Sequence, residues 1–154
     1  MSEALYNREI LRLAASTADA ARLSHPQGSA LRVSPVCGSK VTADVDLDAA
    51  GRIARFGQEV RACALGQASA ALVAASIIGK PRAELAEART QLAEWLAGRS
   101  EAEPGWPGMT IFAPARPHRA RHPSILLALD AAIGAADAAA AMGEAATTSQ
   151  AGAG

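Results

Sequence analysis

The feature that most restricts the fold is a pair of strand-like segments near the middle of the chain. Residues 41–47 alternate apolar and polar side chains, residues 48–52 have the composition of a turn, and residues 53–60 follow as a second segment. Alternation with a period of two is typical of a strand that buries one face. We therefore predict an antiparallel hairpin over residues 41–60, with residues 31–35 as a short edge strand beside it.

Helical patterns surround this hairpin. Apolar residues recur at helical spacing in several segments, each bounded by Pro or Gly, residues that a helix interior tolerates poorly. These segments are residues 3–22, the stretch from Cys63 to Gly79, the stretch from Pro81 to Gly98, and a last stretch from Pro123 through Ile133. Residues 99–117 are rich in Pro and Gly and are expected to be irregular. The predicted fold class is α+β, a small three-stranded antiparallel sheet with helices packed on one face.

Composition indicates a single small domain with a thin core. The chain has 154 residues and is 50% apolar, but aromatic residues make up only 3% and much of the remainder is alanine. Alanine favours helix formation and lets helices approach closely. We expect one domain over residues 1–142. The tail over residues 143–154, made mainly of small and polar residues, has little to bury and is expected to be disordered.

Charge and hydropathy exclude several classes of partner. The formal net charge is zero, so no overall attraction to nucleic acid or to an anionic membrane surface is expected. The chain has no uninterrupted run of about 18 apolar residues, so no membrane span is predicted. Residues 1–8 contain an early acid and no apolar signal core, and the protein is expected to be cytoplasmic.

The two cysteines carry most of the chemical information. Cys37 lies in a turn between Pro35 and Gly38, and Cys63 directly precedes a long helical pattern. The unpaired N–H groups at the start of a helix stabilise a negatively charged sulfur. In a reducing cytosol such cysteines are expected to be free, metal-bound or catalytic rather than paired in a disulfide. The plainer alternative is that both are small buried hydrophobic residues.

Acidic residues in the hairpin do not indicate calcium binding. Asp44, Asp46 and Asp48 alternate along one strand and are expected to face solvent. The glycine and the terminal glutamate of a calcium-binding loop are missing. We therefore exclude a calcium site here.

Several short motifs occur in an order that resembles a known family. The motifs are Pro35-Val36-Cys37-Gly38, Cys63 at the head of a helix of small residues, Ile78-Gly79-Lys80, and His122-Pro123-Ser124-Ile125-Leu126. Over residues 5–137 the chain resembles the U-type iron–sulfur cluster scaffolds, the family of IscU, SufU and the NifU N-terminal domain. The resemblance implies a non-enzymatic scaffold that receives sulfur from a cysteine desulfurase and passes clusters to acceptor proteins.

The chain departs from this family at two positions. Ser39 stands where the family has an aspartate, and Pro123 stands where it has its third cysteine. Proline has no thiolate and cannot bind metal. Of the family's site, the resemblance leaves Cys37, Cys63 and His122, the last matching a histidine that serves as a ligand in some members. Ser39 is a poor ligand and is expected to be a turn residue.

These residues support more than one function. The leading hypothesis is a scaffold-like protein that binds a [2Fe–2S] cluster or iron, or accepts sulfur, through Cys37 and Cys63, with His122 as a further ligand. The alternative is a zinc-binding or metal-free relative that acts as a sulfur relay or regulator of a desulfurase and holds no cluster. A purely structural interaction domain would require both thiols to be inert. A homodimer would bring four thiolates together.

A run of basic residues precedes the last predicted helix and lies beside the candidate ligands. Such a run is expected to be a solvated loop, with an anion site or a contact for an acidic partner as the alternatives. The run consists of Arg116, His118, Arg119, Arg121 and His122.

Overall fold

The sheet has three antiparallel strands in the order β1-β2-β3. The computed structural model describes residues 7–17, 21–35 and 38–153, with side chains as far as residue 144. The strands are β1 (Gly28–Val33), β2 (Lys40–Leu47) and β3 (Ile53–Arg61). The predicted hairpin is confirmed, and the edge strand begins three residues earlier than the predicted residues 31–35.

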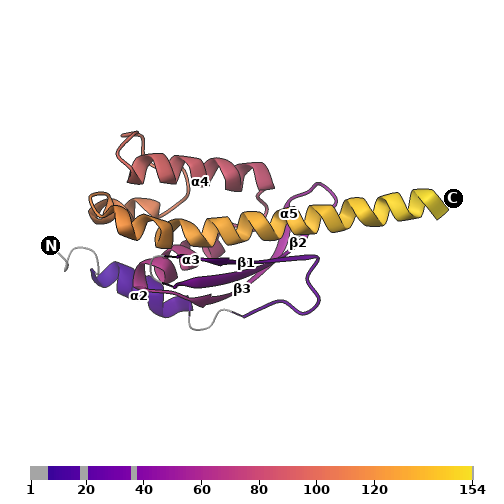
Figure 1. Ribbon diagram of the computed structural model, residues 1–154, viewed down its shortest axis with the longest axis horizontal. Coiled ribbons are helices and arrows are strands. Elements are labelled where there is room, and N and C mark those ends of the chain that lie inside the picture. Colours follow the sequence, from indigo (N-terminus) through magenta and orange to yellow (C-terminus); the bar gives the residue numbers. More distant parts are fainter. Residues whose placement is uncertain (1–6, 18–20, 36–37, 154) are drawn as a thin grey trace.

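One helix precedes the strands and the others follow them, in the predicted order, which confirms the α+β class (Figure 1). The helices are α2 (Arg8–Ser16), α3 (Ala64–Ser76), α4 (Arg82–Leu96) and α5 (His122–Ala153), with 3₁₀ helices η2 (Met109–Ala115) and η3 (Arg119–Arg121). The segment predicted to be irregular therefore contains η2. Helix α2 ends at Ser16, short of the predicted residue 22, and the hydroxyls of Ser16 and Thr17 bond to the carbonyls of Leu13 and Ala14 in its last turn.

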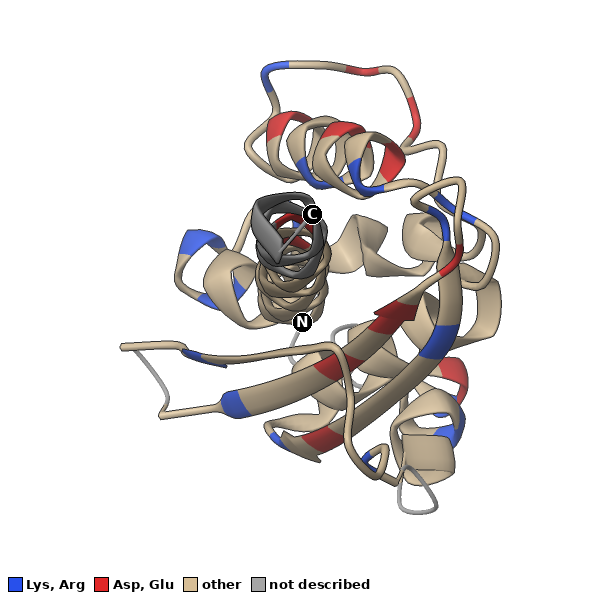
Figure 2. Ribbon diagram, turned by 90° about the vertical axis from the view of Figure 1, so that its right-hand side faces the viewer, with Lys and Arg blue, Asp and Glu red and all other residues tan. Residues whose placement is uncertain are grey.

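The core lies between the sheet and the helices. Val41, Ala43 and Val45 of β2 are fully buried on the face that α3 and α5 cover. Seen end-on in Figure 2, α5 lies between α4 and the sheet. A Cβ atom on Gly28 of β1 would overlap the backbone of α5 and lie 2.8 Å from the Ala139 Cα. Strand and helix therefore meet backbone to backbone, as the alanine-rich composition predicts.

Helix α5 is the longest element of the described chain. The continuous helical stretch Arg119–Glu144, formed by η3 and most of α5, is long and apolar enough to cross a membrane by length and composition. Its mean hydropathy is 1.7 over an 18-residue window, and 56% of that window is buried. Contacts with β1, β2, α3 and α4 explain this apolar character as that of a core helix. Its backbone stays helical past Gly143 to Ala153, where the sequence predicts a disordered tail. Only the backbone is described beyond residue 144, and the disorder of the tail stays a prediction.

The opposite face of the sheet is partly covered by the chain that joins α2 to β1. Asp44 lies on this face and is completely buried, so the prediction that it faces solvent is wrong. Its carboxylate accepts hydrogen bonds from the guanidinium of Arg22 (2.9 and 3.0 Å), the Leu23 amide (3.0 Å) and the Ser29 hydroxyl (2.6 Å). Gly57 permits this covering, because a Cβ there would lie 2.7 Å from the backbone of residues 21 and 23.

The environment of Asp44 favours its charged form. Burial of the carboxyl raises the pKa of Asp44, but the hydrogen bonds and the positive charge of Arg22 lower it by more. The pKa of Asp44 therefore lies below its ordinary value. The ion pair between the buried Asp44 carboxylate and Arg22 holds the segment before β1 against the sheet.

Candidate functional site

Cys63 is the N-cap residue of α3. Its backbone is extended, with φ −64° and ψ 170°, and its carbonyl accepts the first helical hydrogen bond from Gln67 (2.9 Å). The side chain is a half-buried free thiol. The positive end of the helix thus lies beside a sulfur that is partly accessible, as a labile ligand requires.

A tight turn brings the end of β1 and the start of β2 to this helix. The Ser34 amide donates to the Ser39 carbonyl (2.8 Å), and the Gly38 amide donates to the Ser34 carbonyl (2.9 Å). Gly38 has a φ of +71°, which favours glycine at that position. Ser39 is buried, and its hydroxyl accepts from the Cys63 amide at 3.4 Å. Cys37 lies outside the described residues, so its role stays a prediction.

The start of α5 lies beside the start of α3. The Ser69 hydroxyl donates to the Ile125 carbonyl at 2.6 Å, and a Cβ on Gly66 would lie 3.3 Å from the Ser124 carbonyl oxygen. Pro123, half-buried, occupies the first turn of α5, where a missing N–H breaks no helical bond. The starts of α3 and α5 are therefore side by side.

His122 is buried at the beginning of α5. Its Nε2 lies 2.9 Å from the Ala115 carbonyl oxygen and 3.1 Å from the Arg116 carbonyl oxygen. Carbonyls only accept, so we assign the proton to Nε2, which leaves Nδ1 as the nitrogen with a lone pair. Histidines that bind metal are commonly held by a carbonyl in this way. The ligand role of His122 stays a prediction.

The basic residues before α5 differ in their environments. Arg116 packs on Trp95, with its guanidinium carbon 5.0 Å from the ring centroid, and it also donates to the Trp95 carbonyl (2.8 Å) and pairs with Glu101 (3.0 Å). Arg116 therefore has a packing role and belongs to no open anion site. Arg119 is exposed and Arg121 is half-buried, and neither forms an ion pair with a described residue.

The donor groups do not complete a metal site by themselves. Within residues 7–17, 21–35 and 38–144, no three His, Cys, Asp or Glu side chains lie close enough together to hold a metal ion. Cys63 and His122 are the predicted ligands that the structure describes. A set of three or more ligands would therefore need a group beyond these two side chains, such as Cys37 or one from a second molecule.

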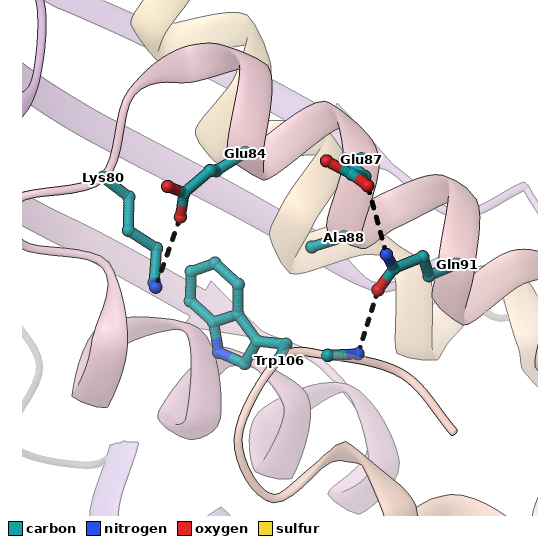
Figure 3. A pocket seen from close by; sticks show the side chains of 7 residues that line it. Lys80, Glu84, Glu87, Ala88, Gln91 and Trp106 are labelled. Atoms are coloured by element: carbon teal, nitrogen blue, oxygen red, sulfur yellow. Dashed lines mark hydrogen bonds and ion pairs between the residues drawn. The ribbon is translucent and has the colours of Figure 1, made fainter. Parts of the chain in front are cut away.

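A separate hollow lies at the other end of α3, against α4 (Figure 3). The Lys80 Nζ lies 5.2 Å from the centroid of the Trp106 ring and 3.5 Å from Glu84, while the indole nitrogen donates to the Leu72 carbonyl (2.8 Å). Trp106, which is buried, thus anchors the connection to the core. No Cys or His lines this hollow, so we do not consider it a metal or sulfur site.

Sequence reasoning missed the residues that hold the site together. Ser34, Gly66 and Ser69 are buried around the turn and the two helix starts. Ser34 is placed opposite Ser39 only by the observed register of the β1–β2 pair, which was not predicted from the sequence. Gly66 and Ser69 lie in the segment 64–71, which consists mostly of small residues and gives no signal that singles them out.

Comparisons with known proteins give a consistent result. No family model matches the sequence, and no curated protein matches it significantly. Among solved structures, the N-terminal part of a nitrogen-fixing NifU-like protein from Brucella abortus has a TM-score of 0.81 and 34% identity, with 90% of this chain and 96% of that chain covered.

Two more distant structures share the fold. A putative iron–sulfur cluster assembly scaffold protein for the SUF system from Fervidobacterium islandicum has a TM-score of 0.76 and 21% identity, covering 85% of this chain and 96% of that one. A hypothetical protein has a TM-score of 0.73 and 18% identity, covering 88% and 98%. At these identities the similarity is one of fold.

Proposed function

The chain belongs to the family of NifU-like N-terminal domains, the U-type scaffolds, and we propose from this that it takes part in iron–sulfur cluster assembly. In this proposal the chain is a binding protein rather than an enzyme. It holds iron or a cluster as cargo, or accepts sulfur, through Cys37 and Cys63. A cysteine desulfurase supplies the sulfur, and acceptor proteins receive the product.

One contact carries the proposal: the hydrogen bond from the Cys63 amide to the Ser39 hydroxyl. It joins the helix start that presents Cys63 to the turn in which Cys37 stands two residues before Ser39 in the sequence. The start of α5 adjoins the same place through Ser69. Three segments that are far apart in the sequence thus support one small region around a thiol.

The chemistry of the donor groups suits a soft cargo. Thiolates bind iron–sulfur clusters and zinc in preference to hard cations. His122, with Nε2 bonded to carbonyls, has Nδ1 to offer as a further ligand. Because Ser39 and Pro123 replace an acid and a thiol of the family, fewer groups of this chain hold the cargo, which favours release over retention.

Anaerobic reconstitution tests the proposal. The full chain is incubated with iron and sulfide, and separately with iron, cysteine and a desulfurase, and its absorption spectrum is recorded. We expect charge-transfer bands that disappear in Cys37→Ala and in Cys63→Ala. His122→Ala should weaken the bands if the imidazole is a ligand, whereas the matched variant His118→Ala should leave them intact. Native mass measurement shows whether the cargo lies in one chain or between two.

A zinc-binding or metal-free relay of sulfur is the second candidate. The lack of a three-residue ligand group in the described part of the chain favours its metal-free form, and a zinc-binding form would need Cys37 or a second molecule to complete the ligands. The same experiment separates the two functions. Absence of charge-transfer bands together with one bound zinc, or with persulfide formed on a thiol by the desulfurase, would replace the scaffold proposal with this one. Thiols inert to both treatments would refute both functions.

A further inference from the structure

The turn at the candidate site contains a buried hydroxyl group without a partner. Ser34 is only 1% exposed, and its Oγ makes no hydrogen bond with any described residue. Among buried side-chain oxygen and nitrogen atoms of the described residues, only Gln58 Oε1 shares this state, and the amide nitrogen of Gln58 is bonded to the Ala70 carbonyl (3.1 Å). Burying a hydroxyl without replacing its hydrogen bonds to water lowers the stability of the fold by about 1–3 kcal/mol. A functional role would explain why the Ser34 hydroxyl is present despite this cost.

The strand register places this hydroxyl on the helix-facing side of the sheet. Val33 pairs with Lys40, and the Ser34 amide continues the ladder by donating to the Ser39 carbonyl. Directly opposed residues of an antiparallel pair point to the same face, with Cβ atoms about 4.5–5.5 Å apart. Ser34 also alternates with Arg32, whose side chain meets α5 at Gly134, and this confirms the assignment of the face.

On this face, Ser39 connects the turn to Cys63. The Ser39 hydroxyl, the cross-strand neighbour of Ser34, accepts from the Cys63 amide. No hydrogen bond joins Ser34 Oγ to Cys63 itself, so its proton is not used by the described part of the site. The turn thus presents a second hydroxyl beside the helix start, within a region that excludes water.

We propose that Ser34 is a positioning residue whose hydroxyl donates a hydrogen bond to a sulfur atom of the iron–sulfur cargo bound at Cys63. Sulfide and thiolate sulfurs accept hydrogen bonds, and such bonds tune the reduction potential of a cluster. A donor stabilises the reduced, more negative state more than the oxidised one. The inference rests on the scaffold function proposed above and adds a residue to which neither the motifs nor the comparisons point.

Ser34→Ala makes a two-sided prediction. In the metal-free protein the variant removes an unsatisfied buried group, so its urea midpoint should stay the same or rise. After reconstitution with iron and sulfide, its reduction potential should become more negative than that of the wild type. Loss of iron to a chelator should become about tenfold faster, as for the loss of one hydrogen bond to a charged group. Ser34→Thr, which keeps the hydroxyl, should restore the potential.

Ser69→Ala is the matched control for stability. Ser69 is also a buried serine, but its hydroxyl is bonded to the Ile125 carbonyl, so its loss should destabilise the metal-free protein. If Ser34→Ala destabilises the metal-free chain as Ser69→Ala does, Ser34 has a structural partner and the inference is overturned. It is also overturned if the variant reconstitutes with an unchanged potential and unchanged iron loss.

Failure of the proposed function gives a different result. If the wild-type chain forms no cluster with iron and sulfide, the scaffold function and the inference fail together. If the wild type forms a cluster and Ser34→Ala matches it in every measurement, the inference alone fails.

Discussion

The ion pair of Asp44 and Arg22 offers the sharpest test of how this fold is held together. We consider Asp44→Asn, which keeps the shape of the side chain and removes its charge. One carboxylate oxygen accepts from the Arg22 Nη2 and the Ser29 hydroxyl, and the other accepts from the Arg22 Nε and the Leu23 amide. If the amide nitrogen introduced by Asp44→Asn replaces the oxygen that faces Arg22 Nη2 and Ser29, the Nη2 donor loses its acceptor. The Ser29 hydroxyl can rotate and accept a hydrogen bond from that amide nitrogen instead.

The expected magnitude follows from burial. Removing one partner of a buried ion pair costs about 3–5 kcal/mol. Asp44 is fully buried, but the Arg22 side chain is 47% exposed and regains water, so we expect the lower end, about 3 kcal/mol. For a chain of this length, that corresponds to a fall in melting temperature of about 6–12 °C.

The control is the same substitution in a surface ion pair. Asp137 pairs with Arg82 at 2.8 Å, nearly the distance of the buried pair, but the two side chains are 54% and 49% exposed. Exposed pairs contribute about 0–1 kcal/mol, so Asp137→Asn should change stability little. Both variants are compared with the wild type by urea denaturation followed by circular dichroism at pH 7.

The pH dependence gives a second readout. Because the pKa of Asp44 is lowered in the folded state, its contribution is fully present above about pH 4 and is lost as the pH falls through the folded pKa. The wild type should therefore approach the Asp44→Asn variant at acid pH. Equal losses in the two variants at pH 7, or a difference that persists unchanged into acid, would refute the reasoning.

Three further changes test other contacts. Gly28→Ala should destabilise the protein by about 1–3 kcal/mol, because the added Cβ overlaps the backbone of α5. Gly143→Ala should stabilise helix α5 by about 1 kcal/mol, because a Cβ there meets no other atom. Thermal melts of the two variants check both predictions. Ser69→Ala should cost about 1–3 kcal/mol by leaving the Ile125 carbonyl without this bond, measured by urea denaturation. His122→Gln should lose any zinc bound through Nδ1 while keeping the fold, and a spectrum unchanged in cobalt-substituted protein would exclude His122 as a ligand.

Local patterns in the sequence predict the parts of the fold that depend on local physics. The hairpin follows from a period of two, and α3 and α4 follow from helical spacing with Lys80-Pro81 and Gly98 as boundaries. The burial of Asp44 could not be predicted in this way. Alternation assigns it to the outer face, but the cover comes from residues about 20 positions away.

The candidate site was predictable to a smaller extent. The starts of α3 and α5 lie together although about 60 residues separate them, so no spacing pattern predicts their proximity. The pairing of Ser34 with Ser39 follows from the register once β1 is placed. The carbonyl contacts of His122 depend on the turn after η2, and no periodic pattern in the sequence predicts that turn.

The serine pair at the turn has a consequence for how the region responds to its surroundings. An acid in place of Ser39 would gain or lose charge with pH, whereas hydroxyls keep the same charge wherever the protein is folded. The support around Cys63 is therefore constant across the physiological range. The hydroxyls of Ser34 and Ser39 add no group that changes its charge beside the start of α3, so a pH dependence of cargo binding would have to come from groups other than these hydroxyls.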